Sequence, residues 1–207
     1  MTSPDFSFES PLWNKGLTHI AGVDEVGRGS FAGPVVVGAV IFPPHLDHTL
    51  ISQINDSELL KHTKRRQLST LIKQTATSWS VALSPVSFIN RQGIVPATFT
   101  AMRRAINDLG NCQHLLIDAF YIPHFSHFNH KNQTPIIKGD QKSFSIAAAS
   151  IIAKVYRDSL LLHLSKQFPQ YGWGHNKGYG TKQHQQALKQ FGPTRHHRTL
   201  YIKRFLT

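Results

Sequence analysis

Four carboxylates stand where short apolar runs end, rather than in the polar stretches that usually carry charge. Asp24 and Glu25 follow the run IAGV, Asp118 follows LLI, and Asp140 follows IIKG. If each run is a strand, the ligand-binding edge of an α/β sheet brings these acids together. Because neighbouring side chains of a strand point to opposite faces, Glu25 is expected where the first strand breaks into the turn that follows.

Converging carboxylates repel one another, so this pattern predicts a counter-ion. Mg²⁺ and Mn²⁺ are hard cations that prefer carboxylate and water oxygens. Two such ions suit an in-line displacement at phosphorus, in which one activates the water and the other stabilises the leaving oxygen. The alternative is four unrelated acids that solvate strand ends or make turns, and the pattern alone leaves both interpretations open.

A glycine-rich turn, Gly27–Gly33 (GRGSFAG), follows the acidic pair. It is similar to a dinucleotide-binding loop, but such a loop opens a helix, whereas Pro34–Phe42 is strand-like. The better interpretation is a turn whose small residues let a substrate backbone approach amide groups beside the metal site.

The strands and helices that must position these groups can be predicted from the hydrophobic pattern of the sequence. The expected strands are Thr18–Glu25, Pro34–Phe42, Ser78–Val86, His114–Ala119 and Pro135–Lys138. The expected helices are His62–Thr77, Pro96–Leu109, Ser143–Gln167 and Lys182–Gln190, and Tyr121–Gln133 is expected to be a loop. Small residues in the first half of Ser143–Gln167 would let that helix pack closely on a sheet. The order predicts an α/β fold with a mixed sheet and helices on its faces.

The chain has 207 residues, 40% of them hydrophobic, which fits one globular domain. Its longest apolar run, Val35–Phe42, is far shorter than the ~20 residues of a membrane-spanning helix. Residues 1–17 contain Pro4 and Pro11 and are predicted to be a loose, flexible lead-in with no secretory signal. The single cysteine, Cys112, suits a reducing compartment, so we expect a cytoplasmic protein without a membrane partner.

The net charge of +12 is unevenly distributed along the chain. Residues 131–207 hold 13 basic and 2 acidic residues, against 10 and 9 in residues 1–130. This one-sided segment favours a polyanion, above all nucleic acid, as the partner. A solvated basic tail is the plain alternative, and an anionic membrane surface is a third.

The run AGVDEVGRGSFAGPVVVGAV resembles the signature of type 2 ribonucleases H, specifically of ribonuclease HII. The resemblance continues in the same order through NRQGIVPATFTAMRRAI, LLIDAF, IIKGDQKSFSIAAASIIAKVYRD, NKGYGT and HHRTLY, and so covers residues 18–201. It implies a ribonuclease H-like catalytic domain over residues 18–207, with a basic C-terminal helical segment from about residue 168.

The activity that this resemblance implies is endonucleolytic. The chain would cleave RNA in RNA–DNA hybrids and incise 5′ of ribonucleotides embedded in duplex DNA, leaving 3′-hydroxyl and 5′-phosphate ends. The implied cofactor is Mn²⁺ or Mg²⁺ at a two-ion site, and the implied partners are the hybrid and the ribonucleotide-containing duplex. We expect a monomer, and the sequence leaves open whether a sliding clamp recruits it. The alternative is a non-catalytic hybrid-binding module of the same fold, which would gain nothing from four repelling acids.

The resemblance also assigns roles to individual residues. The metal-binding, catalytic carboxylates fall on Asp24, Glu25, Asp118 and Asp140. The substrate-reading turn falls on Gly27, Arg28 and Gly29, and the tyrosine that senses the RNA-to-DNA junction falls on Tyr179. Candidate contacts to the nucleic-acid backbone are Lys182, Lys189, Arg195 and Arg198.

Two departures from the family pattern carry no assigned function. Ser30 stands where the family usually has proline, and Glu58-Leu59 replaces a basic pair. Two other features are given plain interpretations. The loop histidines His124, His127 and His130 are expected on a polar surface rather than at a zinc site, and Asp158 is expected to be a structural partner or helix-surface contact.

Overall fold

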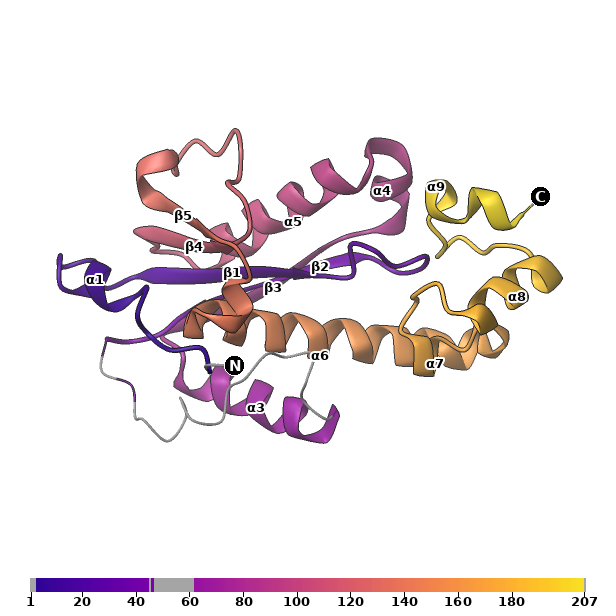
Figure 1. The fold of residues 1–207 in the computed structure, drawn as a ribbon, viewed down its shortest axis with the longest axis horizontal. Coiled ribbons are helices and arrows are strands. Elements are labelled where there is room, and N and C mark those ends of the chain that lie inside the picture. The colour runs from indigo at the N-terminus through magenta and orange to yellow at the C-terminus, as the bar shows by residue number, and fades with distance from the viewer. Residues whose placement is uncertain (1–2, 45, 47–61, 207) are drawn as a thin grey trace.

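A five-stranded sheet forms the centre of the molecule (Figure 1), in a computed structural model that describes residues 3–44, 46 and 62–206. The strands are β1 (Ile20–Val26), β2 (Val35–Ile41), β3 (Ser78–Ser84), β4 (His114–Asp118) and β5 (Gln133–Ile136). Their order is β3-β2-β1-β4-β5. β1 pairs antiparallel with β2 and parallel with β4, and β4 pairs parallel with β5. The sheet is therefore mixed, as predicted.

Helices cover both faces of this sheet. The long helix α6 (Phe144–Gln167) crosses one face, with α3 (His62–Thr75) beside it, and α5 (Ile94–Asp108) lies on the other (Figure 1). A short helix, α4 (Val86–Gln92), precedes α5 and was not predicted. With both faces covered, every residue of β2 is buried, which explains its unbroken apolar sequence.

The backbone of α6 lies directly against β1 and β2. A Cβ atom added to Gly22 would lie 2.1 Å from the carbonyl carbon of Ser145, and one added to Gly38 would lie 2.2 Å from the carbonyl oxygen of Ala149. Both distances are far below van der Waals contact, so only glycine fits at these strand positions. The close packing expected from the small residues of this helix is confirmed.

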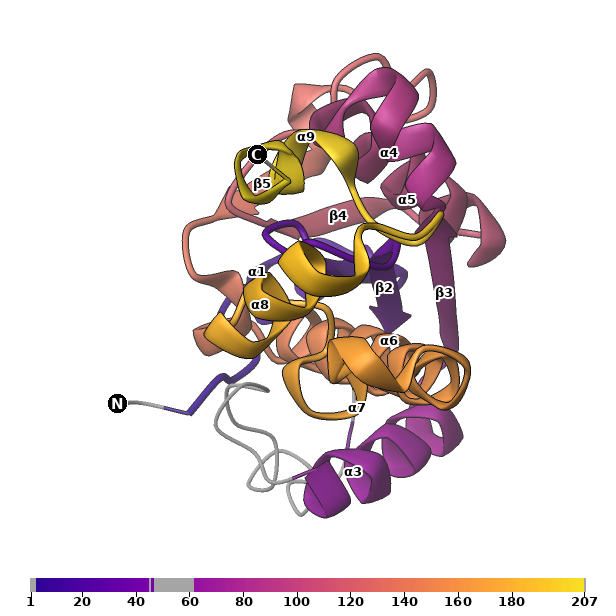
Figure 2. The ribbon, with the colours of Figure 1, turned by 90° about the vertical axis from the view of Figure 1, so that its right-hand side faces the viewer.

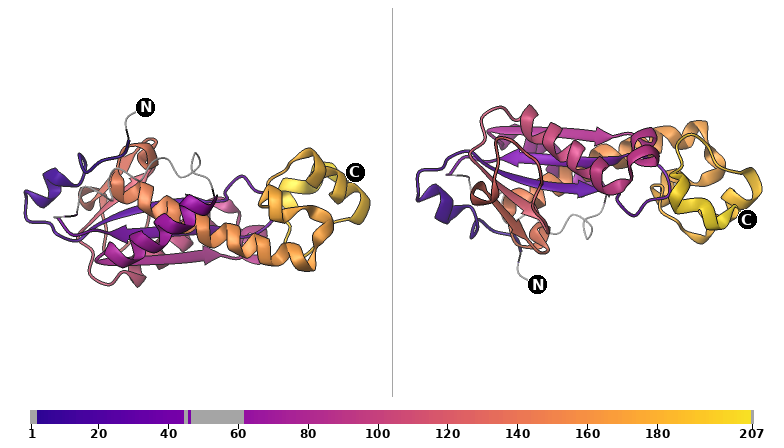
Figure 3. Two further views of the ribbon diagram at one scale, coloured as in Figure 1. Left: turned by 90° about the horizontal axis from the view of Figure 1, so that it is seen from below. Right: turned by 90° about the horizontal axis from the view of Figure 1, so that it is seen from above.

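The chain after α6 folds into a lobe at one end of the sheet, seen end-on in Figure 2 and in profile in Figure 3. This C-terminal lobe, residues 168–206, contains α7 (Trp173–Asn176), α8 (Lys182–Phe191), α9 (Thr199–Ile202) and the 3₁₀ turns Pro169–Tyr171 and Lys203–Phe205. Its apolar cluster includes Leu161, Tyr171, Trp173, Leu188 and Ile202. A solvated tail after α8 is therefore not what the structure shows, since His197 and Arg198 are buried.

The N-terminal segment also differs from the loose lead-in that the sequence suggested. Residues Ser10–Trp13 form a short helix, α1, and the preceding Glu9 is fully buried. The Glu9 carboxylate accepts hydrogen bonds from Ser143 Oγ at 2.7 Å and from the Ser145 amide at 3.0 Å. These bonds fix residues 3–17 to the start of α6, a partner too distant in the chain to be read from local sequence.

Of two further expectations from the sequence, one is wrong and the other concerns residues that the structure does not describe. β1 continues through Glu25 to Val26, so the strand does not break at the acidic pair, because Glu25 pairs in register with Val37 of β2. The Asp56–Leu60 stretch, with its departures at Glu58 and Leu59, lies outside the described residues. Among the residues that are described, no helix is long and apolar enough to cross a membrane.

Candidate active site

The parallel strands β1, β4 and β5 bring four acids to one edge of the sheet. Asp24 and Glu25 lie near the end of β1, and Asp118 is the last residue of β4. Asp140 lies in the 3₁₀ turn Gly139–Gln141, which follows β5. The negative charges of Glu25, Asp118 and Asp140 each raise the pKa of Asp24, so the four side chains share one electrostatic environment. We call this set the acidic edge.

Burial makes the acidic edge costly to ionise. Desolvation is the main reason that the pKa of Asp24 lies well above its ordinary value, repulsion from Glu25 adds to it, and a hydrogen bond with Ser150 opposes it. Desolvation also raises the pKa of Glu25 to about 7, although Arg28 acts in the opposite direction. Positive charge from the protein therefore does not offset the burial of Asp24 and Glu25.

Hydrogen bonds fix one oxygen of each of three carboxylates. Asp24 Oδ1 accepts from the Glu25 amide at 2.7 Å, and Asp118 Oδ1 accepts from the Gly139 amide at 2.8 Å. Glu25 Oε1 accepts from Arg28 Nη1 at 3.2 Å, whereas the buried Glu25 Oε2 has no hydrogen-bond partner. Glu9 Oε2 is also without a hydrogen-bond partner, but only Glu25 lies among other acids, so its orphaned oxygen is the one available to a cation.

This donor set fits a hard divalent cation. As the side chains stand, no group of three or more His, Cys, Asp or Glu residues in the described part of the chain is arranged to hold a metal ion. Glu25 is turned toward Arg28, and Asp118 is bonded to the Gly139 amide. The chemistry still matches Mg²⁺ or Mn²⁺, because the groups are all oxygen donors, they repel one another, and Glu25 Oε2 is unsatisfied.

The glycine turn, Gly27–Gly33, borders the acidic edge through the Arg28–Glu25 ion pair. Gly27 has a φ of +91°, and a Cβ atom there would lie 2.1 Å from Arg157 Nε, so glycine is required for both conformation and space. At Gly29, by contrast, an added Cβ would have nothing within 4 Å. The turn thus packs against the protein at one end and has open space at Gly29.

Tyr179 lies between α7 and α8, beside the same turn. The carbonyl oxygen of the preceding Gly178 accepts hydrogen bonds from the amides of Phe31 at 2.8 Å and Ala32 at 3.1 Å. The Tyr179 ring is half-buried, with the Lys154 ammonium 5.7 Å and the Arg157 guanidinium carbon 5.6 Å from its centroid. The structure therefore places Tyr179 and the glycine turn together, next to two cations.

The four candidate backbone contacts separate into two groups. Lys182, Lys189 and Arg195 are exposed on the C-terminal lobe. Arg198 is fully buried, and its guanidinium donates to the carbonyl oxygens of Arg28 and Gly33. Its assignment as a phosphate contact is therefore wrong, because its donors are occupied inside the protein.

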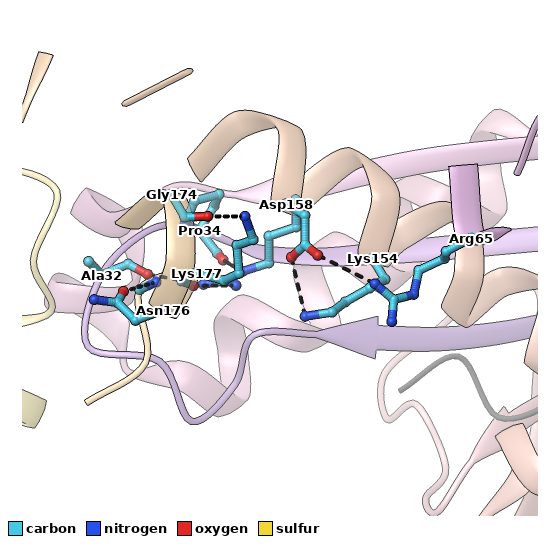
Figure 4. Close-up of polar contacts among 10 residues, drawn as sticks. Ala32, Pro34, Arg65, Lys154, Asp158, Gly174, Asn176 and Lys177 are labelled. Carbon is cyan, nitrogen blue, oxygen red and sulfur yellow. Dashed lines mark hydrogen bonds and ion pairs between the residues drawn. The ribbon is translucent and has the colours of Figure 1, made fainter. Parts of the chain in front are cut away.

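Other residues singled out in the sequence have simpler surroundings. Asp158 is buried and pairs with Lys154 at 3.2 Å and Arg65 at 3.7 Å, so it is a structural partner (Figure 4).

His124 and His130 lie in the loop between β4 and β5, where both line a surface pocket. Sequence reasoning missed Arg157 as a contact of the turn, and nothing in its local sequence shows that it is buried.

Comparisons with known proteins agree with this architecture. The family model for ribonuclease HII matches residues 21–206. Ribonuclease HII of Synechococcus sp. is 41% identical over 198 residues, which are 96% of this chain and 88% of that protein. Ribonuclease HII of Chloroherpeton thalassium is 45% identical over 199 residues, or 94% of each chain.

Solved structures share the fold at lower sequence identity. Ribonuclease H2 from Pyrococcus horikoshii superposes with a TM-score of 0.72 at 23% identity, covering 90% of this chain and 98% of that one. Ribonuclease HII from Archaeoglobus fulgidus, solved in complex with PCNA, gives 0.74 at 21% identity, covering 91% and 97%. The fold is therefore ribonuclease H-like, and the sequence matches show that the chain belongs to the ribonuclease HII family of metal-dependent endoribonucleases.

Proposed function

We propose that this protein hydrolyses RNA in RNA–DNA hybrids and incises duplex DNA 5′ of embedded ribonucleotides, leaving 3′-hydroxyl and 5′-phosphate ends. The observation that carries the proposal is the acidic edge. Its carboxylates lie on β1, at the end of β4 and in the turn after β5, burial and their repulsion raise the pKa of Asp24, and Glu25 Oε2 has no hydrogen-bond partner. Family membership gives this edge its chemistry, since the reaction is metal-dependent hydrolysis.

The residues proposed to hold two divalent cations are Asp24, Glu25, Asp118 and Asp140. When bound, Mg²⁺ or Mn²⁺ supplies positive charge that favours ionised water and stabilises the leaving oxygen. The chain supplies the positioning. The Glu25 amide and Ser150 orient Asp24, and the Gly139 amide orients Asp118 through Oδ1. Arg28 holds Glu25 on the side of the glycine turn.

Ribose selection is proposed to come from the backbone of Gly27, Arg28 and Gly29. The 2′-hydroxyl that distinguishes RNA from DNA is both a donor and an acceptor, so backbone amide and carbonyl groups can bind it. The open space at Gly29 gives a sugar room to approach these groups. The Tyr179 ring, beside the turn, would then stack on the next sugar, which lacks a 2′-hydroxyl.

The duplex is proposed to extend over the C-terminal lobe. Lys182, Lys189 and Arg195 are exposed there, and eight of the chain's basic residues but no acidic residue follow Asp158. Such a surface attracts phosphates regardless of sequence. The acidic edge, the glycine turn and Tyr179 all come from one chain, so a monomer is sufficient for the reaction.

A labelled DNA duplex with one internal ribonucleotide tests the proposal. With Mg²⁺ or Mn²⁺, the protein should incise 5′ of the ribonucleotide, and the matched all-DNA duplex should stay intact. Equal cutting of both duplexes, or cutting in EDTA, would contradict the proposal. Tight binding without incision under all metal conditions would favour the non-catalytic binding module instead.

A further inference from the structure

Two arginines outside the acidic edge are fully buried where the C-terminal lobe meets the glycine turn. Arg157 lies on α6, and Arg198 immediately precedes α9. Both have 0% of their surface exposed. A buried guanidinium must satisfy its five N–H donors inside the protein, so its partners indicate what it is there to hold.

Arg157 bonds to carbonyl oxygens from both sides of this junction. Its Nη2 donates to Ala32 at 3.0 Å, its Nε to Pro34 at 3.1 Å, and its Nη1 to Lys177 at 2.9 Å. Figure 4 shows Ala32, Pro34 and Lys177 gathered in one place, although Lys177 belongs to the C-terminal lobe. One side chain thus connects the end of the glycine turn to the segment that carries Tyr179.

Arg198 bonds to the beginning and the end of the same turn. Its Nη1 donates to the Arg28 carbonyl at 2.7 Å, and its Nε and Nη2 donate to the Gly33 carbonyl at 3.0 and 2.9 Å. Its own amide donates to the Phe31 carbonyl at 2.8 Å. The bond to Arg28 fixes the peptide plane that this carbonyl shares with the Gly29 amide.

The turn has little to hold it from within. Its internal bond, from the Ser30 amide to the Gly27 carbonyl, is long at 3.4 Å. Ser30 also lacks the restriction of backbone φ that a proline would impose. The two guanidiniums instead occupy the carbonyls of Arg28, Ala32 and Gly33. The turn is therefore held by groups that are distant in the sequence: backbone bonds to Gly178 and His196 fix residues 31–33, and the two guanidiniums add the bonds to the Arg28, Ala32 and Gly33 carbonyls.

We infer that Arg157 and Arg198 are positioning residues that fix the glycine turn for recognition of the ribose, and we call the pair the arginine brace. By donating to the Arg28 carbonyl, Arg198 polarises the Arg28–Gly29 peptide and makes the Gly29 amide a stronger donor. The inference rests on the proposed role of the turn in reading the 2′-hydroxyl. It assigns to the C-terminal lobe a task besides binding phosphates, which is to hold the reading groups in place.

The test compares three arginine-to-lysine variants that each keep the positive charge. Arg198→Lys and Arg157→Lys remove the fork of donors from the brace. Arg65→Lys is the matched control, because Arg65 is also buried but pairs with Asp158. Hydrogen exchange of the amides in residues 27–33 should be at least about tenfold faster in the two brace variants and unchanged in the control.

Kinetics on the single-ribonucleotide duplex supply the second measurement. We expect kcat to fall at least about tenfold in Arg198→Lys while KM changes less than about twofold, because the exposed phosphate contacts remain. Guanidinium ion, but not methylammonium, should restore part of the activity of Arg198→Ala. If that variant does not fold, Arg198→Lys decides the matter.

The brace is overturned if Arg198→Lys leaves both the exchange of the turn and kcat within twofold of the parent chain. It is also overturned if Arg65→Lys causes the same losses, or if Arg198→Lys fails to fold, since the role is then general stability. Failure of the proposed function looks different. In that case the parent chain does not incise the duplex, yet exchange in the turn still responds to Arg198→Lys.

Discussion

Asp24 and Arg198 are both buried ionisable groups near the glycine turn. The protein surrounds Arg198 with hydrogen-bond acceptors, but it surrounds Asp24 with other acids. The Arg198 guanidinium donates to two backbone carbonyls within 3.0 Å. Burial raises the pKa of Asp24 well above its ordinary value, three neighbouring carboxylates raise it further, and Glu25 has an oxygen with no hydrogen-bond partner. A buried charge that the protein satisfies holds structure in place, whereas a cluster of buried like charges with an unpartnered oxygen favours a bound counter-ion.

Asp118→Asn tests the unsatisfied side of this comparison and should have the largest effect. The asparagine Oδ1 can still accept from the Gly139 amide, so geometry is kept while a charged ligand is lost. We expect activity to fall about 100-fold or more, because transition-state stabilisation by the metal is weakened. The melting temperature in EDTA should stay unchanged or rise, because repulsion is reduced. A large drop in that temperature would mean that the acid is structural.

Acid should destabilise the C-terminal lobe, because the lobe depends on two neutral histidines. Thr194 N–H donates to His197 Nδ1 at 2.9 Å, which leaves the proton of His197 on Nε2, 3.0 Å from His184 Nε2. His184 Nδ1–H then donates to the Tyr179 carbonyl at 2.9 Å. Protonating either ring would bring two donors face to face. The hydrogen bonds of His184 and His197 are thus all formed only when both rings are neutral.

Burial, followed by repulsion from His184, lowers the pKa of His197 to about 4 from 6.5. Between these values the unfolded chain binds a proton that the folded chain does not, so the free energy of unfolding falls as pH drops from 6.5 toward 4. The loss from this group is at most about 3 kcal/mol. Urea unfolding at several pH values measures it, and His197→Asn should flatten the dependence. Parallel pH curves for the two proteins would contradict the neutral-pair interpretation.

Tyr179 tests whether the ring beside the brace contributes to recognition. Tyr179→Ala should lower incision at single ribonucleotides about tenfold more than cleavage of long hybrids, because only the former depends wholly on the junction. Tyr179→Phe should stay near the parent rate if stacking dominates, and fall toward the alanine variant if the hydroxyl is needed. A uniform loss on both substrates, with a lower melting temperature, would favour a packing role.

Replacing the exposed cations of the C-terminal lobe should have the smallest effect. It should weaken binding whether or not the duplex contains a ribose. Replacing Lys182, Lys189 and Arg195 by glutamine should weaken binding to all duplexes alike. Each lost phosphate contact should flatten the slope of log K against log salt by about 0.9. The matched control is Arg66→Gln, on the exposed side of α3. Unchanged affinity and slope in the triple variant would place the duplex elsewhere.

Local sequence predicted the sheet and the acidic positions because both depend on short-range patterns. Apolar runs ending in Asp24 and Asp118 are strands, and parallel pairing brings their ends together. The expectation that β1 breaks at Glu25 was wrong, because pairing with β2 keeps the strand regular through Val26. Without a break, Glu25 still reaches Arg28, three residues along the chain.

The burial of charged residues could not be predicted in this way. Arg198 has the same charge in sequence as Arg195, but its carbonyl partners lie 165 and 170 positions away. Glu9 likewise meets Ser143 across 134 positions. Whether a charge is exposed or enclosed follows from tertiary packing, which composition and periodicity do not record. The roles of these residues therefore became visible only with the fold.

Calorimetric titration of the metal-free protein with Mn²⁺ tests the central claim, that the acidic edge is left unsatisfied because a cation completes it. Two variants are compared with the parent chain. Asp24→Asn keeps the shape of the site, and His124→Ala alters the histidine loop between β4 and β5. If a cation completes the acidic edge, Asp24→Asn should bind Mn²⁺ at least about tenfold more weakly than the parent, while His124→Ala should bind it equally well. Equal binding by the parent and Asp24→Asn would contradict that claim.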